Sequence, residues 1–165
     1  MRDPSTPVGR SVIVRTSLEP NETESIAAAI GAMLAPGDVV VLTGDLGAGK
    51  TTFVRGLARG LGVTIGVKSP SFAIHLRYPG RIALHHLDLY RLSDVRDLAE
   101  LGLEDVLEQE GVTAVEWGER LGAWLPERAL HIRFEDEGGT KRRLHIEGPA
   151  VLMERFDAPT EERAS

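Results

Sequence analysis

The sequence predicts an α/β protein built as a three-layer sandwich, with a mainly parallel central sheet and antiparallel additions. Strand and helix patterns alternate over the first two thirds of the chain, which is typical of this class. The run "DVVVLTG" at 38–44 is a short apolar strand without polar alternation, as a parallel sheet covered on both faces requires. A closing hairpin around Gly138-Gly139 accounts for part of the antiparallel additions.

The individual elements follow from local composition. The first strand is a β-branched run, and the first helix is rich in Ala, Ile, Met and Leu and ends at Pro36-Gly37. Gly62 stops the second helix, and two later strands flank a turn at Pro79-Gly80. In chain order we expect a strand at 11–16, a helix at 22–34, a strand at 38–44, a helix at 51–61, strands at 72–78 and 81–90, a helix at 98–107, a strand at 112–117, and hairpin strands at 129–135 and 142–148.

One folded domain accounts for most of the chain. A length of 165 residues suits a single core, and we find no internal repeat or interdomain linker. The first ten residues are rich in Pro, Gly and Ser, and the last dozen offer few apolar groups for packing. We therefore expect an N-terminal tail at 1–10, a folded domain at 11–148 and a C-terminal tail at 149–165.

Composition excludes several kinds of function. The chain has no cysteine, so disulfides, thiolate metal sites and cysteine nucleophiles are excluded. The net charge of −6 argues against a protein that grips nucleic acid by itself, so any RNA is expected to be held by a partner. Apolar stretches such as Val39–Leu42 are far shorter than the roughly 20 residues of a membrane helix, and 1–10 lacks the apolar core of a signal peptide. A cytoplasmic protein with no membrane association is expected.

The strongest chemical signal is "GDLGAGKT", from Gly44 to Thr51. It fits the P-loop pattern G-x-x-x-x-G-K-[ST] and stands between a buried strand and a helix, the context that this motif requires. Its glycines let consecutive N–H groups point into one concavity that suits an anion. Lys50 can then reach the β and γ phosphates, the Thr51 hydroxyl can ligate Mg²⁺, and Thr52 can contact the α phosphate. The residues expected to bind the nucleotide here are Asp45, Leu46, Gly47, Ala48, Gly49, Lys50, Thr51 and Thr52.

Two carboxylates are candidates for the chemistry beside the phosphates. Glu116 ends the apolar run "VTAVE" and Asp88 ends "IALHHLD", and both runs are expected to lie beside the P-loop strand. A carboxylate at the end of a neighbouring strand is where a magnesium site usually needs one. One of the two can hold the metal while the other orients water, and the residues alone leave open which does which.

The segment "KSPSF", Lys68 to Phe72, is a candidate switch. It supplies the hydroxyls of Ser69 and Ser71 and a bend fixed by proline, soon after the P-loop helix. A segment of this kind is suited to sensing the γ phosphate. Taken without other support, an ordinary turn explains the same residues.

Histidines and tryptophans near these segments are open to simpler interpretations. Strand alternation places His85 and His86 on opposite faces, so packing or surface roles are favoured over a metal site. Trp117 and Trp124 are expected in the core or at its rim rather than as stacking platforms for bases. Because Trp117 follows Glu116 directly, a place near the nucleotide stays open for it.

A family resemblance is carried by several motifs together. The chain resembles the TsaE family, the small ATPase of the bacterial threonylcarbamoyladenosine pathway, over roughly Ser17 to Glu135. The P-loop alone is shared by many proteins, whereas "HLDLYRL" and "VEW" together are far more discriminating. The motifs that occur in the family's order and approximate spacing are "GDLGAGKTTFVRGLARGLG", "VKSPSF", "HLDLYRL", "ELGLEDVL" and "AVEWGERL".

The resemblance implies both a function and residue roles. It implies an ATPase that binds the complex, with subunits of the TsaD and TsaB type, which transfers a threonylcarbamoyl group to the adenosine beside the anticodon of certain tRNAs. Its hydrolysis of ATP would reset that complex, and tRNA would be met only through the complex. By the same resemblance, Thr51 and Glu116 ligate magnesium, Lys50 holds phosphate, and Asp88 is needed for hydrolysis. Ser71 stands where the family usually has threonine, which keeps the hydroxyl.

Two other functional classes share the same residues. A small-molecule kinase would use the P-loop and magnesium, with Arg91 and Arg96 as possible substitutes for the arginine-bearing lid of such enzymes. A nucleotide-gated binding module without hydrolysis would also show every motif above. GTP is not expected, because no N-K-x-D element follows the P-loop.

Overall fold

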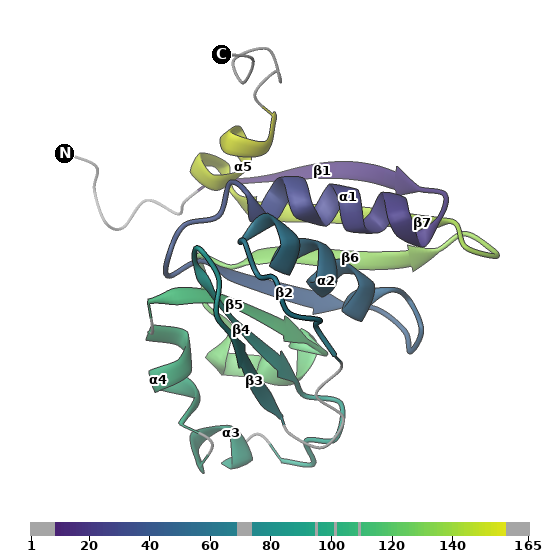
Figure 1. Cartoon of the computed structure of the whole chain (residues 1–165). Coiled ribbons are helices and arrows are strands. Elements are labelled where there is room, and N and C mark those ends of the chain that lie inside the picture. The colour runs from purple at the N-terminus through teal and green to yellow at the C-terminus, as the bar shows by residue number, and fades with distance from the viewer. Residues whose placement is uncertain (1–8, 69–73, 95, 101, 109, 158–165) are drawn as a thin grey trace.

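The computed structural model of the chain describes residues 9–68, 74–94, 96–100, 102–108 and 110–157. Within these ranges, seven strands form one sheet in the order β1-β7-β6-β2-β5-β4-β3 (Figure 1). Along the chain the elements are β1 (Arg10–Ser17), α1 (Pro20–Gly31), β2 (Val39–Thr43), α2 (Lys50–Gly60), β3 (His75–Tyr78), β4 (Ala83–Asp88), α3 (Arg96–Glu100), α4 (Leu103–Glu108), β5 (Gly111–Glu116), the 3-10 segment η1 (Gly118–Trp124), β6 (Leu130–Asp136), β7 (Arg142–Pro149) and α5 (Ala150–Asp157).

The sheet is parallel in its centre and antiparallel at both edges. Strand β2 pairs in parallel with β5 on one side and with β6 on the other, and β5 pairs in parallel with β4. The added strands β3, β7 and β1 are antiparallel to their neighbours. The predicted fold class, a mainly parallel sheet with antiparallel additions, is therefore confirmed.

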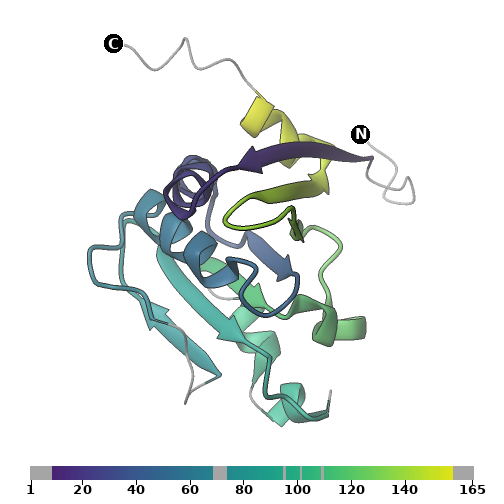
Figure 2. The same ribbon diagram turned by 90° about the vertical axis from the view of Figure 1, so that its right-hand side faces the viewer.

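Helices cover both faces of the central strands, which explains why β2 is apolar on both sides. Val40 and Leu42 belong to a core shared with α1 and α2, whereas Val39 and Val41 belong to a second core with α3, α4 and η1. Figures 1 and 2 show α1 and α2 side by side on one face and η1 on the other. Successive strand residues point to opposite faces, so a strand between two cores must be apolar throughout.

Helices α1 and α2 approach each other closely at glycines. A Cβ built on Gly56 would lie 2.3 Å from the carbonyl oxygen of Glu24 and 2.6 Å from the Cβ of Ala27. A Cβ on Gly31 would lie 2.5 Å from the carbonyl oxygen of Leu57. These glycines are needed because no side chain fits between the two backbones.

Gly56→Ala is expected to lower the free energy of unfolding by roughly 1–3 kcal/mol, the usual cost of overpacking a core. In a helix that packs against nothing, the same change raises the free energy of unfolding by about 1 kcal/mol. The sign of the measured change therefore shows whether α1 and α2 are in close contact at Gly56. Urea unfolding of both proteins measures the difference. Gly66→Ala is a control outside the helix contact, since Gly66 lies between α2 and β3 and a Cβ there has no atom within 4 Å. A Gly56→Ala variant as stable as the wild type would contradict the close packing of α1 and α2.

Two expectations for the helices differ from the structure. The single helix expected at 98–107 is instead two short helices, α3 and α4, because Gly102 between them has a φ of +68°, which interrupts a right-handed helix. Part of the tail expected at 149–165 is the helix α5. Its Leu152 and Met153 are buried in the core that α1 and α2 share, and this packing stabilises a helix that local composition alone did not indicate.

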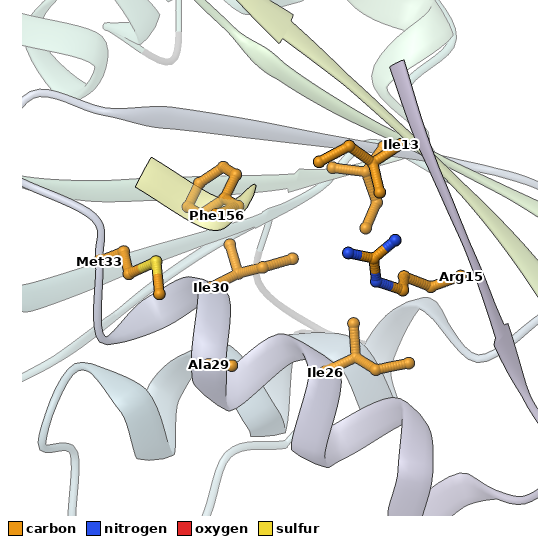
Figure 3. Close-up of a pocket in the computed structure, with 8 residues that line it drawn as sticks. Ile13, Arg15, Ile26, Ala29, Ile30, Met33 and Phe156 are labelled. Carbon is orange, nitrogen blue, oxygen red and sulfur yellow. The ribbon is translucent and has the colours of Figure 1, made fainter. Parts of the chain in front are cut away.

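An apolar pocket of about 160 Å³ lies between β1, α1 and α5 (Figure 3). It is lined by Ile13, Arg15, Ile26, Ala29, Ile30, Met33, Ile146 and Phe156. None of these lining residues belongs to the P-loop motif, and Arg15 supplies the one charged side chain among them. We therefore do not assign the nucleotide to this pocket. Within the described ranges, no helix has both the length and the apolar character needed to cross a bilayer.

Candidate functional site

The P-loop connects the end of β2 to the start of α2, as the motif predicts. Its three glycines all have positive φ values, +150° at Gly44, +78° at Gly47 and +104° at Gly49. Gly49 is also the residue that caps the N-terminus of α2. At Gly47 and Gly49 this left-handed conformation is one that other residues adopt only with strain, so the loop needs glycine at both positions.

Lys50 lies folded over the loop and is only 5% exposed. Its ammonium donates hydrogen bonds to the carbonyl oxygens of Gly44 and of Asp45, the latter at 2.9 Å. The same ammonium lies 4.0 Å from the centroid of the Trp117 ring, a cation–π contact. Burial lowers the pKa of Lys50, and nearby carboxylates, Glu116 first among them, oppose this shift. The positive charge is thus held beside the loop by groups that come from two distant parts of the chain.

Thr51 and Glu116 meet where α2 begins and β5 ends. The Thr51 hydroxyl donates a 2.8 Å hydrogen bond to Oε1 of Glu116, which is 2% exposed. The second oxygen, Oε2, lies 3.0 Å from Nε2 of His86, which is fully buried. A hydroxyl and a carboxylate at this spacing are oxygen ligands of the kind that Mg²⁺ prefers, so these two side chains fit a magnesium ion.

Asp88 lies next to Glu116 at the same edge of the sheet. The two residues are direct partners in the parallel pairing of β4 with β5. Oδ1 of Asp88 accepts a 2.9 Å hydrogen bond from the backbone N–H of Tyr90. Burial raises the pKa of Asp88, the Tyr90 hydrogen bond opposes this, and the charge of Glu116 adds to the rise. The structure therefore brings both predicted carboxylates together with Lys50 and Thr51.

Trp117 has an unusual backbone that turns it toward the P-loop. Among the described residues other than glycine, Trp117 is the one with a positive φ, which is +59°. Its ring lies 5.0 Å from that of Tyr90, centroid to centroid, and carries the Lys50 contact on its face. The next residue must be glycine, because a Cβ on Gly118 would lie 1.9 Å from a methyl carbon of Val41. Trp117 and Trp124 both pack against the second core, as expected, and Trp117 also lies beside the loop.

Arg142 is a site residue that sequence reasoning missed. Its Nε donates a 3.1 Å hydrogen bond to the carbonyl oxygen of Ala48 in the P-loop. Its Nη1 donates to the carboxylate of Asp136 at 3.2 Å and to the carbonyl of Gly139 at 2.8 Å. The guanidinium thereby ties the turn between β6 and β7 to the loop. Since 94 positions separate Arg142 from Ala48, no local pattern could have indicated the contact.

The other predicted site residues are two serines of the candidate switch, Thr52, Leu46 and an arginine weighed as a lid residue. Ser69 and Ser71, the hydroxyls of the candidate switch, lie outside the described residues. Thr52 follows Thr51 in the first turn of α2 and is half-buried, and Leu46 is 74% exposed at the loop. Arg96, weighed as a lid residue, forms a 2.9 Å ion pair with Asp94.

The two histidines face opposite sides of the sheet, as alternation predicts. His86 contacts Glu116, whereas Nδ1 of His85 lies 3.0 Å from Nε2 of His75. Burial lowers the pKa of both His75 and His85. Within the described ranges, no group of three or more His, Cys, Asp or Glu side chains could hold a metal ion.

The fold and this loop define the class of protein, a P-loop-type nucleotide-binding protein. Residues 17–144 match the model of the family described as threonylcarbamoyl adenosine biosynthesis protein TsaE. The chain therefore belongs to the TsaE family.

Relatives from several bacteria carry the name tRNA threonylcarbamoyladenosine biosynthesis protein TsaE. One from Bacillus subtilis is 42% identical over 129 residues, which is 78% of this chain and 80% of the relative. Another from Treponema pallidum is 45% identical over 103 residues, 62% of this chain and 76% of the relative. The crystal structure of YdiB from Bacillus subtilis is similar with a TM-score of 0.75 and 33% identity, and the likeness covers 90% of this chain and 95% of that one.

Proposed function

We propose that this chain is the ATP-binding and ATP-hydrolysing subunit required for threonylcarbamoylation of the adenosine beside the anticodon of tRNA. In this role it acts in the cytoplasm as a nucleotide-dependent switch on the threonylcarbamoyl-transferase complex, whose subunits are of the TsaD and TsaB type. The name of its relatives supports the pathway. The net charge of −6 supports contact with tRNA through the complex rather than by this chain alone.

One observation supports the nucleotide site most directly. The Thr51 hydroxyl at the end of the P-loop and the buried carboxylate of Glu116 are joined at 2.8 Å, with the Lys50 ammonium beside them over the loop. In this proposal the N–H groups of 45–52 and Lys50 bind the phosphates of ATP, while Thr51 and Glu116 hold Mg²⁺. Magnesium would neutralise charge that develops on the phosphates.

Because Thr51 and Glu116 are assigned to magnesium, Asp88 can act on the attacking water. Its carboxylate is fixed by the Tyr90 N–H and lies one strand away from Glu116. Burial raises its pKa, which makes it a stronger proton acceptor than an exposed aspartate. We assign Asp88 to orienting water or taking its proton, and Ser69 and Ser71 to sensing the γ phosphate.

Hydrolysis is expected to be slow in the isolated protein and faster with partners. Among the described residues, the arginine hydrogen-bonded to the P-loop is Arg142, and its guanidinium is bound to the backbone carbonyl of Ala48 and to the neighbouring turn. P-loop proteins without an arginine at the transferred phosphate commonly hydrolyse slowly on their own. A partner that supplies charge or orders the switch would accelerate the reaction, and it must bind the ATP and ADP states with different affinities.

The test is ATP turnover by the purified chain, alone and with the reconstituted TsaD–TsaB-type complex and tRNA. We expect the complex to raise turnover at least about tenfold, a smaller gain than the roughly 10³- to 10⁵-fold that an added arginine at the phosphates achieves in other P-loop proteins. The proposal fails if the isolated protein already turns over at the stimulated rate and the complex changes nothing. Phosphate transfer to a metabolite instead of water would indicate a kinase.

A further inference from the structure

His86 is a buried side chain that the proposed function leaves without a role. It lies on β4 with an exposed fraction of 0%, and its Nε2 is 3.0 Å from Oε2 of Glu116. Glu116 uses its other oxygen, Oε1, to accept the hydrogen bond from Thr51. The carboxylate thus has a histidine on one oxygen and the P-loop threonine on the other.

The sheet itself fixes this arrangement. In the parallel pairing of β4 with β5, His86 pairs with Ala114 and Asp88 pairs with Glu116. Alternation puts all four side chains on the face that α2 covers, where Ala114 belongs to the same core as the apolar residues of α2. The distance between the imidazole and the carboxylate is therefore set by two adjacent central strands, which are far less adaptable than a loop.

The direction of the hydrogen bond follows from chemistry. An ionised carboxylate can only accept, so Nε2 of His86 carries the hydrogen and donates it to Glu116. Nδ1 of His86 is buried and has no hydrogen-bond partner among the described residues. With the hydrogen on Nε2, the imidazole donates to the Glu116 oxygen. With the hydrogen on Nδ1, Nε2 and the Glu116 oxygen would face each other as two acceptors with no hydrogen between them.

We propose that His86 is a positioning residue for the carboxylate of Glu116. Its Nε2–H holds Oε2, so that Oε1 stays turned toward Thr51 and available to a metal ion. The inference rests on the magnesium role proposed for Glu116. Partners that orient metal ligands in this way typically contribute about 10- to 100-fold to metal affinity.

The test compares His86→Leu with His86→Gln, because glutamine can place an N–H near the position of Nε2 and leucine cannot. Calorimetry of ATP binding over a magnesium series gives the apparent magnesium affinity of the nucleotide complex. We expect His86→Leu to lower that affinity about tenfold or more, and His86→Gln to restore most of it. Binding of ATP without magnesium is expected to stay nearly unchanged in both variants.

A matched control is His85→Leu, which removes the adjacent buried histidine on the opposite face, where it contacts His75. A purely structural role of His86 would change the melting temperature but leave the magnesium dependence intact. If His86→Leu does not fold, His86→Asn replaces it, because the shorter amide does not reach the Nε2 position. Equal magnesium dependence in His86→Asn and His86→Gln would then overturn the inference.

Failure of this inference can be told apart from failure of the proposed function. If wild-type ATP binding does not depend on magnesium, the proposed site fails and the inference fails with it. If ATP binding by the wild type depends on magnesium, and the ATP complex of His86→Leu binds magnesium as tightly as that of the wild type, only the role of His86 is wrong. In a Glu116→Ala background, His86→Leu is expected to have no further effect on magnesium, and an additional loss there would show that His86 does not act through Glu116.

Discussion

Lys50→Ala is expected to weaken ATP binding by about 2 kcal/mol or more, roughly 30-fold in the dissociation constant. The ammonium is only 5% exposed and already lies over the loop, bound to the carbonyls of Gly44 and Asp45. Charge-assisted hydrogen bonds to phosphate are among the strongest that a protein makes, and alanine removes them without filling the space. Burial also lowers the pKa of Lys50, which means that the charged ammonium is disfavoured in its present surroundings. Negatively charged phosphate oxygens would stabilise the ammonium better than the two carbonyl oxygens do.

Calorimetric titration with ATP and magnesium measures the loss. Lys141→Ala is the matched control, because Lys141 lies in the turn between β6 and β7, is 47% exposed and pairs with Glu137. That variant should bind ATP as the wild type does. Both variants are compared at equal folded fraction, established by thermal melting. Wild-type affinity in folded Lys50→Ala would show that the P-loop lysine does not contact the nucleotide.

The central fold was predictable because local patterns and tertiary packing agree there. The run Val39–Leu42 is apolar throughout because β2 lies between two cores. The positive φ values of the P-loop require its glycines. The helices at the edges were less predictable. Gly102 divides α3 from α4, and α5 forms because Leu152 and Met153 reach a core built by other segments. Composition within a short window carries no information about such packing.

The candidate site also has a part that the sequence predicts and a part that it does not. Its two carboxylates were predictable because both end apolar strands, and parallel strands end at one edge of a sheet. The contacts that orient them were not. His86 looked like a packing residue, since alternation reveals its face but not that Glu116 lies 3.0 Å away on β5. The positive φ of Trp117 and the bond from Arg142 to Ala48 likewise depend on residues far apart in sequence.

Asp88→Asn is expected to separate hydrolysis from binding, and it has the largest effect on rate that we predict. Asparagine keeps the size of the side chain and can still accept the hydrogen bond from the Tyr90 N–H, so the end of β4 should keep its geometry. It cannot act as a base. General base catalysis typically contributes about 100- to 10,000-fold, so single-turnover hydrolysis with the partner complex should fall at least about 100-fold. ATP affinity, which depends on Lys50 and Thr51, should change little.

Single-turnover hydrolysis and calorimetry on the same preparations provide the two measurements. Asp94→Asn is the control, because Asp94 lies in the segment after β4 and pairs with Arg96 away from any contact with the P-loop residues named above. If Asp88→Asn loses ATP affinity and hydrolysis in equal proportion, Asp88 serves binding rather than the chemical step. If it hydrolyses ATP at the wild-type rate, the water is positioned by another group. A variant that binds ATP but does not hydrolyse it would stay in the ATP state on the complex. It would therefore also test whether hydrolysis is needed to release the chain from the complex.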